Sequence, residues 1–369
     1  MKKVLIGHAS AISSVGKNLD LTFQSLLQHK SGIKKINRFD TKNYKTQYAA
    51  CIDNIESSDN KSSFLNLIDL ILEPIKDIPD NTRVITATTK ACIDLLGKKN
   101  NYLLPGDIPN YIIDKLNLSG SGINISSACA SSTIAIIKGA QMIINNRADS
   151  VLIICADIVS EFVFSGFSCL NALSNSYSKP FDIIRDGLTL GEGGAAILLV
   201  SEDIAKKHSF QCNTMIAGFG IANDATHITA PAKDGRGLIL AIEKALNTAN
   251  VTPESIGAIN AHGTGTIYND LMEIKAFNHI FKDLTIPVNS IKGSIGHCLG
   301  GAGGIEAALA TLMLKEKILP GTYGLSSPEP EAEKSISPEN IDISSDYLMS
   351  TNSGFGGTNA ALILKREIC

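Results

Sequence analysis

A single thiol among small residues is the first candidate for covalent chemistry in this sequence. Residues 126–132 (SSACASS) place Cys129 where a strand is expected to turn into a helix. A thiol at a helix N-terminus meets unpaired N–H groups and the positive end of the helix dipole, which favour the thiolate and can hold an oxyanion. Taken alone, however, Cys129 would more often be a packing residue, because free cysteine is usually buried.

A histidine stands in the second motif. Residues 260–266 (NAHGTGT) place His262 at the end of an expected strand, beside two glycines that let a ligand approach the backbone closely. The hydroxyl groups of Thr264 and Thr266 can hydrogen-bond an amide-bearing ligand. The alternative is a structural histidine that merely hydrogen-bonds a nearby backbone carbonyl. Loops at strand ends often carry functional residues, so a functional role for His262 is favoured.

The third motif contains both a lysine and a histidine. Residues 292–304 (KGSIGHCLGGAGG) hold Lys292 and His297, and the carboxyl group of Glu306 follows shortly after. Glycines this dense disfavour a helix by about 1 kcal/mol each relative to alanine, so close helix packing around a site is expected to compensate. A phosphate-binding loop is the rival interpretation. The run lacks the lysine–serine ending of a P-loop and the spacing of a dinucleotide fingerprint, which argues against it.

The fourth motif, residues 352–359 (NSGFGGTN), holds Phe355 between glycines. A ring that its neighbours pack so little can move, which suits a gate or a loop that donates a backbone N–H group. An ordinary glycine-rich hairpin turn is the alternative. That alternative would be preferred if the other three motifs were absent.

One cysteine and two histidines on glycine-rich turns suffice for acyl-thioester chemistry. A Cys/His pair also describes a cysteine protease, but a protease would need one histidine oriented by Asn or Asp. Here the second histidine shares its motif with a lysine, and no protease signature surrounds the thiol. Two histidines that donate to one thioester oxygen would stabilise an enolate, which a peptidase never forms.

Short apolar segments alternate with longer helical ones, which is typical of an α/β fold. The expected strands are 4–7, 83–87, 122–126, 150–156 and 195–200, then 214–220, 256–261, 286–289 and 360–364. The expected helices are 131–147, 237–250 and 303–317, and the polar helical stretch 201–211 marks a junction.

A repeated sequence pattern indicates two related halves. Residues 123–146 read as strand, small-residue turn and long helix, and residues 288–317 repeat this order. Each puts a reactive side chain at the turn, where open α/β sheets carry ligands. We therefore predict an N-terminal half, 1–205, that carries Cys129, and a C-terminal half, 206–369, that carries both histidines, Lys292 and the glycine-rich gate.

The composition excludes several other classes of function. A net charge of −3, 5% aromatic residues and no tryptophan argue against a nucleic-acid partner. The eight cysteines form no CxxC pair and no zinc-like spacing with histidine, so no metal site is expected. They stand among small or apolar residues, which suggests a reducing, cytoplasmic location. The opening MKKVLIG is interpreted as a strand rather than a signal peptide, and no run reaches the length of a membrane span.

The four motifs, in this order, resemble those of the elongating β-ketoacyl–acyl carrier protein synthases. The similarity extends to residues 4–16 (VLIGHASAISSVG), 36–44 (INRFDTKNY) and 179–200 (KPFDIIRDGLTLGEGGAAILLV), so it covers essentially the whole chain. This resemblance implies an α/β thiolase-like fold, in which two pseudo-duplicated halves form a five-layered αβαβα core, usually in a dimer.

The resemblance also implies a mechanism. Cys129 would accept the acyl chain, and its thioester oxygen would be held by the backbone N–H groups of Cys129 and Phe355. His262 and His297 would donate hydrogen bonds to the malonyl thioester carbonyl as CO2 leaves. The resulting enolate would attack the acyl group on Cys129 and release a 3-oxoacyl chain on its carrier protein.

The remaining roles come from the same resemblance. Lys292 matches a lysine that orders the site, Glu306 its acidic neighbour, and Asp270 a supporting aspartate. Thr264 and Thr266 match threonines that contact the phosphopantetheine arm of acyl carrier protein, and Phe355 matches the gate. No cofactor is expected beyond this carrier-bound arm, and the expected partners are acyl carrier protein and a second ketosynthase-like subunit, identical or related.

The sequence departs from the family pattern in three places. The stretch before Cys129 is short, and we place the missing part in the cap loops after Ala87. The linker 174–179 is also short, and Ser353 stands where the gate motif usually has a further phenylalanine. These changes indicate an altered acyl pocket and a specialised polyketide or polyene synthase that pairs with a chain-length subunit. The alternatives are a non-catalytic chain-length partner, which the intact Cys129 and histidines disfavour, and a thiolase. A thiolase would need a second cysteine in a Cys-Gly motif, whereas this chain has only the terminal Cys369.

Overall fold

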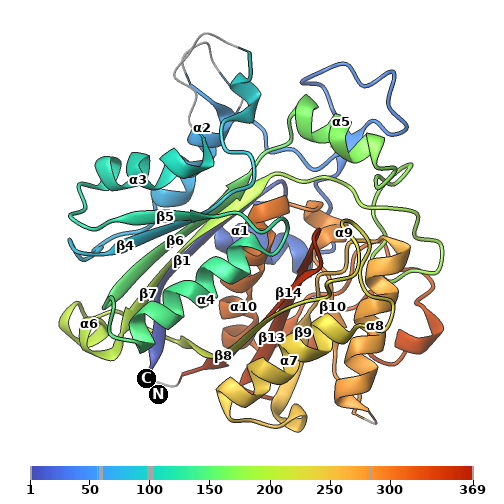
Figure 1. Ribbon diagram of the computed structural model, residues 1–369. Coiled ribbons are helices and arrows are strands. Elements are labelled where there is room, and N and C mark those ends of the chain that lie inside the picture. The colour runs from blue at the N-terminus through green and yellow to red at the C-terminus, as the bar shows by residue number, and fades with distance from the viewer. Residues whose placement is uncertain (1, 56, 58–60, 98–103, 283, 368–369) are drawn as a thin grey trace.

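The computed structural model describes residues 2–55, 57, 61–97, 104–282 and 284–367, and is shown in Figure 1. The strands of its main sheet are β1 (Val4–Ser13), β4 (Arg83–Ala87), β5 (Gly122–Ile125), β6 (Ser150–Asp157), β7 (Gly193–Ser201), β8 (Thr214–Asn223), β9 (Ile256–Asn260), β10 (Val288–Asn289), β13 (Tyr347–Gly354) and β14 (Thr358–Arg366). The helices are α1 (Leu19–Leu27), α2 (Ser63–Leu72), α3 (Ile108–Leu116), α4 (Ser131–Ile144), α5 (Glu161–Cys169), α6 (Glu202–Lys207), α7 (Arg236–Ala249), α8 (Ile267–Phe281), α9 (Lys292–Ile295) and α10 (Ala302–Glu316). Two-residue strands form small ribbons: β2 (Lys34–Lys35) with β3 (Tyr48–Ala49), and β11 (Ile318–Leu319) with β12 (Ile341–Asp342).

The strand order shows that the chain is built from two equivalent halves. The sheet runs β10-β9-β13-β14-β8-β1-β7-β6-β4-β5, and β8 meets β1 through one residue pair, Leu5 with Met215. Read outward from this junction, each half has its strands in the chain order first, fifth, fourth, second, third. The strand directions also match, because the first three are antiparallel neighbours and the outer pairs are parallel. The repeated pattern in the sequence therefore reflects a structural duplication.

The two halves of the sheet form two strand layers, and helices outside and between them bring the total to five layers (Figure 1). Helices α2 and α3 pack on the outer face of the first half, and α7 and α8 cover the outer face of the second half. Helices α4 and α10 lie in the middle layer and contact strands of both halves. Three large clusters of buried apolar side chains fill the spaces between the layers. The predicted thiolase-like α/β architecture is confirmed.

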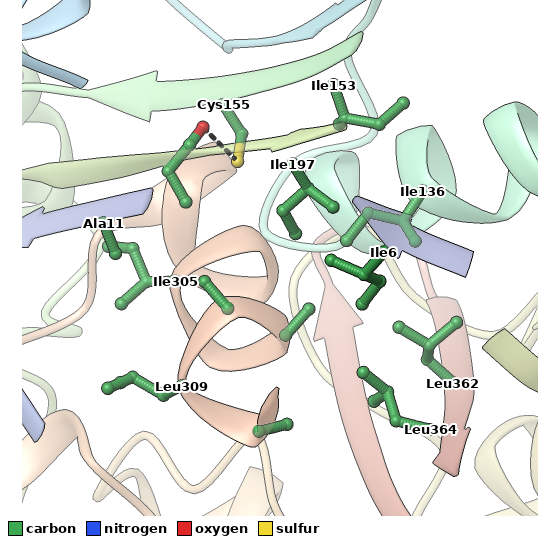
Figure 2. Close-up of a cluster of buried hydrophobic side chains, with 14 of the residues drawn as sticks. Ile6, Ala11, Ile136, Ile153, Cys155, Ile197, Ile305, Leu309, Leu362 and Leu364 are labelled. Carbon is green, nitrogen blue, oxygen red and sulfur yellow. Dashed lines mark hydrogen bonds between the residues drawn. The ribbon is translucent and has the colours of Figure 1, made fainter. Parts of the chain in front are cut away.

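Strand β6 shows why the strands read as continuous apolar runs. Every residue of β6 is buried. Successive side chains point to opposite faces of a strand, so Val151 and Ile153 join the central cluster, while Leu152 and Ile154 join the outer one. Figure 2 shows the central cluster, where side chains of α4 and α10 meet those of β6, β7 and β14. Full burial of one such aliphatic side chain is worth about 1.5–3 kcal/mol.

Buried polar residues explain why the sequence patterns do not reveal two of the elements near the site. Strand β13 was not predicted because Ser350, Thr351 and Asn352 are polar, although all three are buried. Helix α8 was not predicted because its inward face carries buried carboxyl groups, those of Asp270 and Glu273, which break the apolar periodicity. In both cases the buried polar groups find hydrogen-bond partners that only the folded chain provides.

Other differences concern the bounds of elements. The first strand continues beyond the predicted 4–7 to Ser13, past a bulge between Ile6 and His8, and β10 is shorter than the predicted 286–289. The predicted boundary between residues 205 and 206 falls inside α6, which packs against β1 and β7. Among the described residues, no helix is both long and apolar enough to cross a membrane.

Gly304 lets α10 approach β6 closely, so Gly304→Ala is expected to destabilise the fold. A Cβ atom at this position would lie 1.8 Å from the Cys155 Sγ atom, which is itself buried. We expect a loss of about 1–3 kcal/mol in the free energy of unfolding, measured by urea denaturation. The matched control is Gly166→Ala in α5, where nothing lies within 4 Å of the new Cβ and stability should be unchanged or slightly higher. Equal stability of the two variants would contradict this packing argument.

Candidate active site

Cys129 lies in a tight turn immediately before α4. Ala128 has a positive φ of 48°, a left-handed conformation that is unfavourable for alanine. The first residue of α4 holds this turn: Ser131 Oγ accepts from the backbone N–H of Ser127 at 2.8 Å and donates to the Ala128 carbonyl at 2.6 Å. The predicted strand–turn–helix arrangement is therefore present, with the thiol at the helix N-terminus and 7% exposed.

The thiol contacts one histidine directly. The Cys129 Sγ atom lies 2.9 Å from His297 Nε2, a hydrogen bond between residues 168 positions apart. His297 follows α9 and Gly296, and the φ of +68° at Gly296 turns the chain. The backbone N–H of His297 donates to the Thr189 carbonyl at 2.7 Å. The backbone of His297 is thus held against the segment before β7.

The second histidine completes the cluster. His262 follows β9, and its ring meets that of His297 edge to face, with centroids 5.1 Å apart. Glu273 on α8 holds the loop, because its carboxyl oxygens accept from the backbone N–H of His262 at 2.8 Å and of Gly263 at 2.7 Å. Burial, and next the neighbouring Asp270, raise the pKa of Glu273 to about 7.

Burial controls the protonation of this cluster. It raises the pKa of the Cys129 thiol to about 12, although the positive charge of Lys292 acts in the opposite direction. Burial, followed by the charge of Lys292, lowers the pKa values of His262 and His297 well below 6.5. The resting site therefore holds a neutral thiol and two neutral imidazoles. The helix terminus alone favours a thiolate, but desolvation of the buried sulfur acts against it more strongly.

Lys292 and Glu306 lie behind the histidines as a buried ion pair. Lys292 Nζ lies 2.5 Å from Glu306 Oε1, and both side chains are almost fully buried. The amide of Asn352 on β13 donates to the other Glu306 oxygen at 2.7 Å and lies 3.3 Å from His262 Nδ1. Neither member of the ion pair lines the cavity. They act on the cluster through charge and through Asn352.

A cavity of about 380 Å³ opens beside the cluster. Cys129, His262 and His297 line it. Its wall is largely apolar. The other residues that line it include Phe167, Leu170, Leu188, Thr264, Thr266, Ile267, Ser353 and Phe355. A largely apolar cavity with a few polar groups at one place is typical of a site for a small or chain-like organic ligand.

The fourth motif forms a β-hairpin. Its chain reverses between β13 and β14 at Gly356 and Gly357, which both have positive φ. The ring of Phe355 lines the cavity and stacks on Phe167 of α5, with centroids 5.9 Å apart. The hairpin alternative is thus correct for the backbone, while Phe355 occupies the place on the cavity wall that a gate requires.

A residue of α8, Asp270, holds the loop that carries the two threonines. Thr264 and Thr266 both line the cavity, and their hydroxyl oxygens lie 2.9 Å apart. Asp270 does not line the cavity. Its carboxyl group accepts from the backbone N–H of Thr264 at 3.1 Å and of Phe181 at 2.8 Å, so it joins this loop to the segment before β7.

The structure adds two residues to those that the sequence indicated. Glu273 gave no signal because α8 was not predicted. Asn352 is part of the fourth motif, but its contact with His262 joins residues 90 positions apart. Nothing in the local sequence indicates that contact.

Cys129, His262 and His297 also form the donor set of a thiophilic cation, since their ligand atoms lie within 4.8 Å of one another. Two ligands of one tetrahedral zinc ion, at bond lengths of about 2.3 and 2.1 Å, would lie roughly 3.6 Å apart. The 2.9 Å between Cys129 Sγ and His297 Nε2 is shorter and corresponds to a hydrogen bond. The geometry fits proton transfer between these two groups. That the protein uses no metal stays a prediction.

Comparison with known proteins agrees with this geometry. Residues 97–205 match the family "Beta-ketoacyl synthase, N-terminal domain", and residues 214–326 match "Beta-ketoacyl synthase, C-terminal domain". The 3-oxoacyl-[acyl-carrier-protein] synthase 2 of Vibrio cholerae is 30% identical, over 99% of both chains. The enzyme of the same name from Staphylococcus aureus is also 30% identical, over 99% of this chain and 98% of its own.

Solved structures of similar shape cover the whole chain as well. A ketosynthase in complex with its chain length factor from Xenorhabdus doucetiae is 27% identical, with a TM-score of 0.87 over 99% of this chain and 98% of its own. A β-ketoacyl synthase from Burkholderia phymatum is 25% identical, with a TM-score of 0.87 over the full length of both. The ishigamide ketosynthase/chain length factor, at 24% identity and a TM-score of 0.89, shows the same fold. With its thiol, two histidines and duplicated fold, this chain belongs to the β-ketoacyl synthase family.

Proposed function

We propose that the protein is an acyltransferase of the 3-oxoacyl–acyl carrier protein synthase type, which lengthens an acyl chain by decarboxylative Claisen condensation. The observation that carries this proposal is a thiol 2.9 Å from one of two adjoining histidines, on the wall of a largely apolar cavity. The full-length similarity to enzymes named 3-oxoacyl-[acyl-carrier-protein] synthase 2 supports the same activity.

In the first half-reaction, Cys129 Sγ attacks the carbonyl carbon of a carrier-bound acyl thioester. The bond from that carbon to the phosphopantetheine sulfur breaks, and the new acyl–Cys129 bond forms. The thiol proton moves to His297 Nε2 and then to the departing phosphopantetheine thiolate. The 2.9 Å contact supports this route, and it compensates for a thiol whose pKa is raised by burial.

In the second half-reaction, a carrier-bound malonyl group loses CO2 and becomes an enolate. The imidazoles of His262 and His297 hydrogen-bond the thioester oxygen on which the negative charge gathers. The enolate carbon then attacks the acyl–Cys129 carbonyl, the new carbon–carbon bond forms, and the bond to Sγ breaks. The products are a 3-oxoacyl carrier and the Cys129 thiolate, which takes a proton from solvent to restore the thiol.

The oxyanion of each tetrahedral intermediate needs donors close to Cys129. We propose the backbone N–H groups of Cys129 and Phe355. The N-terminus of α4 supports the first, and the hairpin supports the second: a Cβ atom built on Gly354 would lie 3.2 Å from the Cys129 nitrogen. Thr264 and Thr266, on the same cavity wall, are the proposed contacts of the phosphopantetheine arm.

The rival activities fit the structure less well. A thiolase needs a second catalytic cysteine, and among the described residues Cys129 is the only cysteine that lines the cavity. Cys369 lies outside the described residues. A non-catalytic chain-length partner has no need of a thiol and two histidines in contact.

We propose acyl carrier protein as the substrate partner and a second ketosynthase-like subunit as the structural partner. The curated relatives carry acyl carrier protein in their names, and two of the solved structures hold a ketosynthase together with a chain length factor. Strand β5 forms the outer edge of the first half, and Ile123 on it is 49% exposed. An open, apolar strand edge suits pairing with another subunit.

A cytoplasmic location and the use of no cofactor complete the proposal. The seven cysteines in the described part of the chain form no disulfide, and six of them are buried. Such usage suits a reducing compartment. The two half-reactions above need no bound group beyond the arm that brings the substrates.

Acylation of Cys129 tests the proposed function directly. Incubation with an acyl–carrier thioester should add the mass of one acyl group to the tryptic peptide 116–138, in which Cys129 is the only cysteine. The added mass should disappear when malonyl carrier is supplied, and a 3-oxoacyl carrier should appear. Labelling of another peptide, or none with carriers of any acyl length, would overturn the assignment.

Acyl transfer should also keep its rate below the pH at which ordinary histidines protonate. His297 accepts a proton only when it is uncharged, and burial and Lys292 hold its pKa well below 6.5. The rate should therefore stay nearly constant as the pH falls from 8 through 6.5. Lys292→Met removes a charge that lowers this pKa, so its acid limb should move to higher pH; the exposed Lys275→Met is the control. A wild-type rate that halves near pH 6.5 would contradict this expectation.

A further inference from the structure

Asn352 holds a central place behind the histidines. It lies near the end of β13 and its side chain is fully buried. The Thr133 hydroxyl on α4 donates to Asn352 Oδ1, and Asn352 Nδ2 donates to Glu306 Oε2 at 2.7 Å. The same nitrogen lies 3.3 Å from His262 Nδ1. One amide thus joins the middle layer of the fold to a histidine of the site.

The orientation of this amide follows from its partners. Glu306 forms an ion pair with Lys292 at 2.5 Å, and the carboxylate of an ion pair can only accept hydrogen bonds. The side of the amide that faces Glu306 must therefore be the NH2 group. The reversed amide would place Oδ1 against a carboxylate oxygen and would deprive the Thr133 hydroxyl of its acceptor. Only one orientation satisfies all three neighbours.

The second hydrogen of this NH2 group faces His262 Nδ1. That ring nitrogen must accept, so it carries no proton. A neutral imidazole has one N–H, which is then on Nε2. We infer that Asn352 is a positioning residue that holds His262 as the tautomer with its proton on Nε2, ready to donate to the substrate oxygen. This inference deepens the proposed function and rests on it.

His297 contrasts with His262 in this respect. Its Nδ1 atom is buried and has no hydrogen-bond partner among the described residues. Its Nε2 faces the Cys129 thiol. Among the described residues, the reacting thiol is thus the only group that contacts a ring nitrogen of His297, which suits a ring that takes up a proton in one step and donates in the next. The two histidines divide the work: His262 is a fixed donor, and His297 is a proton carrier.

The variant Asn352→Asp tests this role because it keeps the size of the side chain and removes the donor to His262. Even if the new aspartic acid is protonated, it has a single O–H group, and that group donates its hydrogen bond to the Glu306 carboxylate. His262 would then donate from Nδ1, and its Nε2 would lose the proton that the enolate needs. Malonyl decarboxylation should fall on the order of 10-fold to 100-fold, the usual effect of losing a group that orients a metal-binding imidazole. Acylation of Cys129 should stay within about threefold of wild type, since it depends on His297.

Nitrogen NMR of histidine-labelled protein reads the tautomer without any turnover. The chain has seven histidines, and the His262→Gln variant identifies the resonances of His262. In the wild type, Nδ1 of His262 should show the shift of an unprotonated nitrogen and Nε2 that of a protonated one. Asn352→Asp should reverse the two. The apolar variant Asn352→Leu, which has no donor, should give a mixture and an intermediate rate of decarboxylation.

Asn289→Asp in β10 is the matched control for a buried acid. Asn289 is 1% exposed and its amide donates to the Pro320 carbonyl at 2.9 Å. This variant should lose stability but keep the wild-type ratio of decarboxylation to acylation. The inference is overturned if Asn352→Asp also keeps that ratio, or if wild-type His262 carries its proton on Nδ1. A wild-type protein that neither takes up acyl groups nor releases CO2 would instead overturn the proposed function, and the NMR result would still decide the tautomer.

Discussion

Replacing Cys129 by serine is expected to lower the rate of condensation by about 10³-fold or more. The substitution changes one atom and keeps the tight turn before α4, which is held by Ser131 and the backbone. A serine hydroxyl, however, is a far weaker acid and nucleophile than a thiol. His297, whose pKa is lowered by burial, is a weak base that would rarely take the hydroxyl proton. The acyl–enzyme on peptide 116–138 should therefore be lost together with product formation.

The exposed Cys169 offers a matched control. It lies at the end of α5 and does not line the cavity. Cys169→Ser should keep both acylation and condensation. If Cys129→Ser retained more than about a tenth of the wild-type rate, Cys129 could not be the acyl acceptor, because nucleophile replacements cause losses several orders of magnitude larger.

His262→Ala is expected to separate the two half-reactions. His262 has no hydrogen bond to Cys129 among those the structure describes, so acyl transfer should stay within a few-fold of wild type. Decarboxylation should fall by about 10²–10³-fold, the usual effect of removing one donor to a developing oxyanion. Acyl transfer is followed by mass spectrometry and decarboxylation by CO2 release from malonyl carrier.

His297→Ala should behave differently, because His297 serves both steps. Its loss removes the acceptor of the thiol proton at 2.9 Å as well as a donor to the enolate. Acyl transfer should slow, although less than decarboxylation, since the α4 terminus and the Lys292 charge still favour the thiolate. The exposed His279→Ala on α8 is the control. Equal losses of both half-reactions in His262→Ala would refute the division of roles between the histidines.

Local sequence was sufficient to identify the reacting groups. Cys129, His262 and His297 each lie in a turn whose small residues permit the positive φ angles that the turn requires, so the motif itself places the side chain at the end of a strand or the start of a helix. The dense glycines of 292–304 predicted close helix packing, and α10 does pack closely against its neighbours at Gly303 and Gly304. The duplicated α/β fold could be predicted because strand–turn–helix units repeat along the chain.

The tertiary structure alone decided how these groups act on one another. The contact between Cys129 and His297 joins the two halves, and burial between the layers reverses the expectation of a resting thiolate. Glu273 and Asn352 were missed because a buried polar residue breaks the apolar pattern of its element, and its partners come from distant segments. Desolvation and hydrogen-bond satisfaction depend on the whole packed environment, whereas a turn depends on its own few residues. For this reason the sequence by itself was enough to predict a candidate nucleophile, two candidate histidines and the fold, and only the folded chain showed how burial shifts their pKa values and where Asn352 lies.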